Sequence, residues 1–226
     1  MSEPLNPDDF IITRKRKKYK FAKFHNAENC FELKQWDKRH IDVAEIGAGT
    51  GLFAVELAAL HPGKIFAAVD VKADRLQKGA YQALERGLKN VVFIRARADQ
   101  IDQLFAAQSL EQIWLTFPDP FPRKHSAGRR LTHPHFLEKY AALLKGSTLN
   151  RENKMHSSSL YLKHDNVEFF HWSLEQLVAE KWHIDELSFD LHESELADDY
   201  KILTTYEKRW LGEGLKTNFA RVHVAK

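Results

Sequence analysis

The sequence has a single cysteine, Cys30, and no long apolar run. One cysteine excludes an intramolecular disulfide and is typical of a reducing compartment, so we expect a cytoplasmic protein. No segment approaches the ~18 consecutive apolar residues of a membrane-spanning helix. Residues 1–9 contain three acidic side chains, which is not the pattern of a secretory signal peptide. With one cysteine and no H-E-x-x-H pattern, we expect no metal site.

The formal net charge of +3 over 226 residues conceals an uneven distribution. Residues 14–23 and 123–130 are rich in Lys and Arg and contain no acid, so the rest of the chain is acidic. A solvated surface is the commoner origin of such a run, and contact with a polyanion such as nucleic acid is the alternative. We expect residues 1–20 to form a basic, flexible N-terminal arm and residues 21–226 a single domain, present as a monomer or homodimer.

Strand and helix patterns alternate from Ile41 onward. Short apolar runs predict strands, and longer segments with helical periodicity predict helices between them. We expect strands at 41–46, 64–71, 90–99, 112–117, 159–165, 184–191 and 217–224, and helices at 52–61, 72–87, 133–145 and 167–180, with another before the last strand. This order predicts an α/β fold, namely a seven-stranded, mostly parallel sheet with one antiparallel edge strand and helices on both faces.

Polar residues follow the expected strands where each strand ends. In a parallel sheet, ligands bind beyond these carboxyl ends. A carboxylate after the second strand suits ribose hydroxyls, and one after the third can accept from an adenine amino group. For a single carboxylate a helix cap or ion pair would be the simpler explanation, and the glycines alone could form a tight turn without a ligand. The residues in question are Glu45, Gly47, Gly49, Gly51, Asp70, Asp99, Asp119 and Asp165.

Asp119 is enclosed by prolines in the sequence FPDPFP, residues 117–122. Proline restricts its own backbone and that of the preceding residue, so this aspartate is held on a stiff turn. Stiffness is what positioning a reacting group requires. An aspartate that merely caps a turn is the alternative, but it would not explain the basic side chains that follow directly.

These motifs together resemble those of the bacterial tRNA (guanine-N7-)-methyltransferases. The resemblance rests on EIGAGTG, on FPDPFPRK with the trailing RRL, and on TTYE at residues 204–207, and it extends from about residue 14 to 222. It implies a Rossmann-like class I methyltransferase fold and a guanine of the tRNA variable loop as target. It implies S-adenosylmethionine binding by Glu45, Gly47, Gly49, Gly51, Asp70, Asp99 and Asp119, with Asp119 also catalytic. It further implies substrate contacts at Arg123, Asp165, Thr204, Thr205, Tyr206 and Glu207.

The implied chemistry agrees with the residue types. Guanine N7 is an acceptor without a proton, so no strong general base is needed. The N1–H and 2-amino donors of guanine can both be held by a carboxylate, and carboxylates also favour the positive charge of the methylated base. We therefore interpret Asp119 as an orienting and electrostatic residue. Contacts with the RNA backbone are expected from Arg14, Lys15, Arg16, Lys17, Lys18, Lys124, Arg129 and Arg130.

The sequence departs from the family pattern at several positions. The family usually has Trp at Phe121, Lys at Arg123 and Thr at His164, and a polar insertion occupies residues 146–158. Two other functions therefore stay open at this point. One is a methyltransferase of the same fold that acts on a protein or small molecule. The other is a non-catalytic RNA-binding paralogue.

Overall fold

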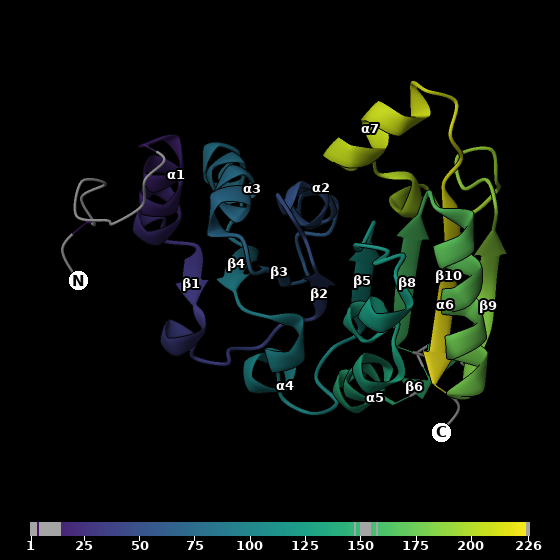
Figure 1. The fold of residues 1–226 in the computed structure, drawn as a ribbon. Helices are drawn as coiled ribbons and strands as arrows, with labels where there is room; N and C mark the ends of the chain where they lie inside the picture. Colours follow the sequence, from purple (N-terminus) through teal and green to yellow (C-terminus); the bar gives the residue numbers. More distant parts are fainter. Residues whose placement is uncertain (1–3, 5–14, 147, 150–154, 157, 225–226) are drawn as a thin grey trace.

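The computed structural model describes residues 4, 15–146, 148–149, 155–156 and 158–224. Its main feature is an eight-stranded sheet with the order β1-β4-β3-β2-β5-β8-β10-β9 (Figure 1). All neighbouring strands are parallel except β10, which is antiparallel to both β8 and β9. The strands are β1 (Cys30–Glu32), β2 (Val43–Ile46), β3 (Phe66–Asp70), β4 (Val91–Arg95), β5 (Gln112–Thr116), β8 (Ser159–His164), β9 (Trp182–Ser188) and β10 (Asn218–Val224).

The predicted α/β class and the mostly parallel sheet are confirmed, and two details differ. The sheet has eight strands rather than seven, because the three residues of β1 pair with β4. The antiparallel strand lies inside the sheet, between β8 and β9, rather than at its edge. Hydrophobic periodicity identifies strands but carries no information on which strands pair.

Helices cover both faces of the sheet (Figure 1). One face carries α1 (Lys15–Asn26), α2 (Leu52–Leu60) and α3 (Ala73–Glu85), and the other carries α4 (Ile101–Leu104), α5 (Pro134–Leu143) and α6 (Val167–Ala179). A short helix, α7 (Thr205–Leu211), precedes β10. None of the described helices is both long and apolar enough to cross a lipid bilayer.

Helix boundaries follow local chemistry. Pro134 is the first residue of α5, where a missing N–H costs nothing. The Asn166 side chain caps α6 by accepting from the Phe169 N–H. Gly87 follows α3 with φ +67°, the left-handed conformation that glycine adopts without strain.

Helix α1 begins at Lys15, so the boundary expected at residue 20 falls within this helix. Ala22 and Phe24 are buried, and α1 lies beside α3 (Figure 1), where Lys23 Nζ sits 5.0 Å from the centre of the Tyr81 ring. Of the expected RNA contacts, Arg14 lies outside the described residues. The backbones of Lys15 and Arg16 belong to α1 together with Lys17 and Lys18.

The polar insertion forms a small antiparallel pair of strands, β6 (Thr148–Leu149) and β7 (Met155–His156). It leads into the first residues of β8, at the amino edge of that strand. The insertion is therefore at the opposite edge of the sheet from the carboxyl ends where the functional residues are expected.

Candidate active site

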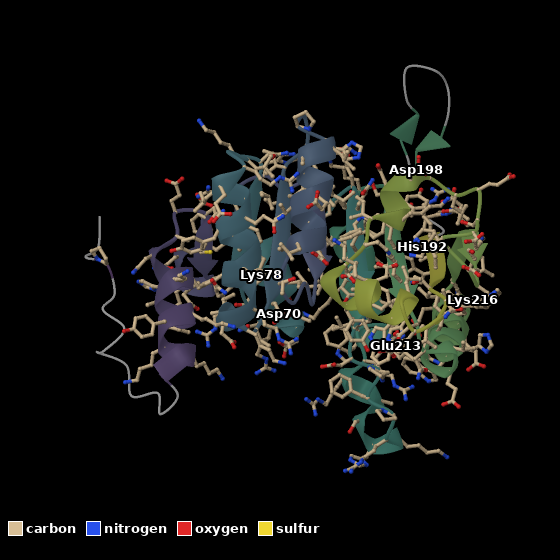
Figure 2. All side chains as sticks on the ribbon, turned by 90° about the horizontal axis from the view of Figure 1, so that it is seen from above. Asp70, Lys78, His192, Asp198, Glu213 and Lys216 are labelled. Carbon is tan, nitrogen blue, oxygen red and sulfur yellow. The ribbon has the colours of Figure 1, made fainter. Side chains whose placement is uncertain are left out.

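A cavity of about 520 Å³ lies at the carboxyl edge of the parallel strands. Six predicted site residues line it together, namely Gly47, Gly49, Asp70, Asp99, Asp119 and Arg129. Figure 2 looks onto the α1–α3 face and shows Asp70 where β3 ends, beside α3 with Lys78 on its exposed side. The topology thus joins residues separated by more than seventy positions at one site.

The glycine loop after β2 is held by Asp70. The Asp70 carboxylate accepts from the Gly49 N–H at 2.9 Å and from the Lys72 N–H at 2.8 Å. Gly47 and Gly49 have φ of +75° and +57°, a region in which other residues are strained. A Cβ on Gly49 would meet nothing within 4 Å, so the cavity beside this loop is open to a ligand.

Glu45 and Gly51 do not line the cavity and lie in the packed interior behind it. A Cβ on Gly51 would come within 2.6 Å of the Phe93 ring, so this glycine allows close packing of the loop against β4. Glu45 accepts from the Thr116 hydroxyl at 2.5 Å and from the Ala54 N–H at 3.2 Å. Burial raises the pKa of Glu45 to about 7.

Asp99 follows β4 and is paired with Arg97. The guanidinium of Arg97 donates to both carboxylate oxygens, through Nε at 3.0 Å and through a second, shorter contact. The Arg97 side chain is exposed and the Asp99 side chain is partly exposed. Asp99 therefore lines the cavity while it is paired with Arg97. An ion pair at the surface contributes little to the free energy of unfolding.

Asp119 sits on a strained loop. Phe117 and Phe121 have φ of +52° and +39°, although each precedes a proline. Positive φ is rare for bulky side chains, and such outliers persist only where the surroundings hold them. The Asp119 side chain is exposed and has no hydrogen-bond or ion-pair partner within the described part of the chain.

Two side chains hold the carbonyls on either side of Asp119. His164 Nε2 donates to the Pro118 carbonyl at 2.9 Å. Arg130 donates from Nε to the Pro120 carbonyl at 2.9 Å and from a terminal nitrogen to the Phe121 carbonyl at 3.1 Å. The Arg130 guanidinium also lies 4.3 Å from the centre of the Trp172 ring. The Arg130 side chain is therefore held by contacts within the protein, and the RNA contact expected from the sequence stays a prediction.

The segment 204–207 is partly buried. Glu207 is buried and accepts four hydrogen bonds, from Lys163 Nζ, the Thr204 N–H, His192 Nε2 and the Thr217 hydroxyl. The Thr204 hydroxyl caps α7 by accepting from the Glu207 N–H, and the Thr205 side chain lies outside the described ones. Tyr206 is 48% exposed, with its ring 5.5 Å from Phe117. Figure 2 shows His192 on the α7 side of the molecule, apart from Asp70.

Known proteins are similar to this chain over most of its length. A family model described as "Putative methyltransferase" matches residues 39–220. A tRNA (guanine-N(7)-)-methyltransferase from Christiangramia forsetii is 35% identical over 207 residues, which cover 88% of this chain and 88% of that protein. A protein of the same name from Bacteroides thetaiotaomicron is 36% identical and covers 80% of this chain and 68% of its own. The chain belongs to the tRNA (guanine-N(7)-)-methyltransferase family.

Solved methyltransferase structures have a fold similar to that of this chain. A 16S rRNA methyltransferase, KamB, superposes with a TM-score of 0.58 at 13% identity, covering 86% of this chain and 91% of its own. A 16S rRNA (adenine(1408)-N(1))-methyltransferase from Catenulisporales acidiphilia, solved with its cosubstrate SAM, gives 0.55 at 14% identity and covers 98% and 92%. At these identities the likeness concerns the fold, and it confirms the predicted Rossmann-like class I methyltransferase architecture.

The remaining predicted residues of this methyltransferase lie around the cavity mouth. Arg123, Lys124 and Arg129 are exposed in the loop that follows Asp119, where η4 (Lys124–Arg129) forms. Asp165 directly follows β8, with Oδ1 3.3 Å from His164 Nδ1. Among the described residues, no group of three or more His, Cys, Asp or Glu side chains is arranged to hold a metal ion.

Sequence reasoning missed three contributors to this site. Lys163 lies in an apolar strand and is fully buried, and a lone lysine in such a run could have signalled a buried ion pair. His164 stood out only as a departure from the family pattern. Trp172 gave no signal, because its role depends on Arg130, which is distant in the sequence.

Proposed function

We propose that this chain transfers the methyl group of S-adenosylmethionine to N7 of a guanine in the variable loop of tRNA. The observation that carries the proposal is the shared cavity, because Asp119 lines the same space as Gly49, Asp70 and Asp99. The names of the curated relatives, which align over most of the chain, support this substrate and this position. A cytoplasmic location is part of the proposal, since the substrate is tRNA.

The residues present suit the cofactor. The cavity volume falls within the roughly 300–1,000 Å³ of small-molecule sites. Asp70 has each oxygen engaged by only one N–H, which leaves lone pairs for ribose hydroxyls. Gly49 leaves open space, and Asp99 is accessible for the adenine end. When bound, the cofactor supplies an electrophilic methyl group on a positively charged sulfur.

Asp119 is the residue assigned to the guanine. Its carboxylate is exposed and unpaired in the described structure, so both oxygens can accept from the N1–H and 2-amino groups. Since N7 carries no proton, the protein's task is to orient the base rather than to remove a proton. Asp119 and Asp165 also place negative charge where the product becomes cationic.

Basic side chains at the cavity mouth would bind the RNA backbone. Arg123, Lys124 and Arg129 are exposed and form no ion pair with a described acid. Helix α1 adds lysines at a second place, since it runs opposite to β1 and its basic N-terminal end lies at the carboxyl edge. Two separated basic elements suit a large polyanion better than a small substrate.

The test is a methylation assay with nucleoside analysis. The purified protein is incubated with isotopically labelled S-adenosylmethionine and an unmodified tRNA transcript, and the digest is examined for 7-methylguanosine. We expect labelled 7-methylguanosine, and none from a transcript in which the variable-loop guanosine is replaced by 7-deazaguanosine. Label on another nucleoside, or acceptance by protein or small molecules only, would contradict the proposal.

A further inference from the structure

We propose that His164 and Arg130 are positioning residues that hold the peptide carbonyls on both sides of Asp119. They thereby keep the Asp119 carboxylate in the position from which it contacts the substrate. The kinetic consequences rest on the proposed function. The conformational consequences do not, because they concern the loop in the free protein.

The loop needs such support. Phe117 and Phe121 both adopt positive φ, and both precede prolines, which further narrows the backbone conformations they can reach. The loop therefore tends to relax unless neighbouring groups hold it. Between the two strained residues, neighbouring side chains hold the carbonyls of Pro118 and Pro120, the two residues on either side of Asp119.

The His164 contact has a defined protonation state. The Asn166 N–H donates to His164 Nδ1 at 2.8 Å, so Nδ1 accepts and the ring proton sits on Nε2, facing the Pro118 carbonyl. The ring is buried, 4.4 Å from the Phe169 ring. Asn218 fixes the backbone by donating to the His164 carbonyl at 2.9 Å. The neutral imidazole thus has a single N–H donor, Nε2–H, which is directed at the Pro118 carbonyl.

The Arg130 contact is anchored by the same helix. Its guanidinium spans the Pro120 and Phe121 carbonyls and packs over Trp172, which belongs to α6. Asn166, which orients His164, is the N-cap of α6. Both contacts on the Asp119 loop therefore depend on residues of α6 and of the end of β8.

Acid should break the Asn166 contact that orients the His164 ring. The charged groups that face the imidazole are Asp165, 3.3 Å away, and Asp119. A protonated ring cannot accept from the Asn166 N–H, and its new Nδ1–H would turn to Asp165. Burial lowers the pKa of His164, so the neutral ring prevails near neutral pH and the change occurs on the acid side.

The first experiment compares His164→Leu with His164→Gln. Leucine removes the donor, whereas glutamine places an amide N–H near the position of Nε2 and does not titrate. For His164→Leu we expect kcat to fall about 10- to 100-fold, with cofactor affinity by calorimetry and KM for tRNA within about threefold of wild type. His164→Gln should recover most of kcat and lose the acid-side fall of the pH–kcat profile.

The second experiment tests Arg130. Arg130→Met keeps an apolar stem near Trp172 and removes the two donors. We expect a similar loss of kcat. The double variant His164→Leu, Arg130→Met should also have a low kcat, but its loss should be smaller than the product of the two single losses, because both residues support the same loop. His61→Leu, at the amino edge, and Arg86→Met, paired with Glu56, serve as matched controls with unchanged kcat.

Amide hydrogen exchange provides a readout independent of catalysis. The Phe117 N–H, at the start of the loop, is protected because it donates to the Lys163 carbonyl at 2.9 Å, and we expect faster exchange at this amide in His164→Leu and Arg130→Met. Unchanged exchange in both variants would overturn the proposal even if wild type methylates tRNA. A raised KM for tRNA with unchanged kcat in Arg130→Met would assign Arg130 to RNA binding instead. Faster exchange in a protein that does not methylate tRNA would reject the proposed function alone.

Discussion

At the scale of single residues, Asp119 stands apart from the other carboxylates of the site. Asp70 accepts two backbone N–H groups and Asp99 pairs with Arg97, whereas Asp119 has no described partner. A carboxylate kept exposed and unpaired on a strained loop is available for a ligand. This availability leads to the first prediction.

Replacing Asp119 by asparagine keeps the shape of the side chain and removes its charge. We expect kcat to fall about 100- to 1,000-fold, the usual effect of losing one preorganised electrostatic group, with the melting temperature within a few degrees of wild type. Steady-state methylation of a tRNA transcript measures the change. Wild-type turnover in Asp119→Asn would exclude the assigned role.

Glu45 gives the protein a predictable dependence of stability on pH. Burial raises the pKa of Glu45 from an ordinary value of 4.5 to about 7. The protonated carboxyl therefore contributes its full stabilisation of the folded protein below the unfolded pKa, and this stabilisation is lost as the pH rises through about 7. Glu45→Gln stays neutral throughout. Relative to wild type, the variant should therefore gain about 2–3 kcal/mol in free energy of unfolding between pH 5 and pH 8.

Urea titrations of both proteins at the two pH values measure this gain. Since both proteins share all other titrating groups, the difference isolates Glu45. A constant difference between the two free energies would show that Glu45 is ionised in the folded protein at pH 5.

At the scale of elements, the turn between β2 and α2 depends on close packing. Gly51→Ala combines a positive φ of +68° with a Cβ 2.6 Å from the Phe93 ring, so we expect a loss of about 2–5 kcal/mol in free energy of unfolding. Gly87→Ala is the matched control, with φ +67° and no atom within 4 Å, and should lose about 1–2 kcal/mol. Equal losses in chemical denaturation would refute the packing argument.

The attachment of α7 depends on one buried ion pair. Lys163 and Glu207 lie 2.9 Å apart and are both inaccessible to solvent. Glu207→Gln leaves the lysine without its counter-charge, and we expect destabilisation by about 3–5 kcal/mol with faster amide exchange in α7. The double variant Lys163→Met, Glu207→Leu should recover much of this loss. Failure to recover would mean that the hydrogen bonds from His192 and Thr217 dominate.

The sequence predicted elements better than their pairing. The strands β2 to β5 and β8 lie within or nearly within their predicted ranges, because buried parallel strands are continuous apolar runs. The three residues of β1 are too short to show periodicity. The position of β10 depends on contacts with two strands distant in the chain, which no local pattern encodes.

The same distinction applies to the site. Residues at strand ends could be predicted to meet, since the carboxyl ends of parallel strands share one edge, and Gly47, Gly49, Asp70, Asp99 and Asp119 do line one cavity. The internal contacts of Arg130 and Glu207 could not be predicted. Their residue types are equally suited to RNA or substrate, and only the fold shows which partners are close.

At the scale of the whole molecule, charge should govern tRNA affinity. Lys124 and Arg129 are exposed at the cavity mouth, whereas Arg130 is bonded internally. Removing Lys124 and Arg129 together should lower the slope of log affinity against log salt by about 1–2, because each neutralised phosphate contributes roughly 0.7–0.9. Filter binding between 50 and 300 mM salt, about the range in which such slopes are resolved, measures it. Arg130→Met should leave the slope unchanged, and a reduced slope would place Arg130 on the RNA.

The place of β10 within the sheet has a consequence for how the protein is made. Ribosomes release a chain from its N-terminus, yet β10 must enter between β8 and β9, which are both synthesised earlier. Until residues 218–224 emerge, each of those strands exposes a hydrogen-bonding edge, the feature that promotes mispairing between nascent chains. Asn218, whose side chain fastens His164, arrives with the same strand. Translation must therefore reach β10 before either the sheet or the Asp119 loop can acquire its final form.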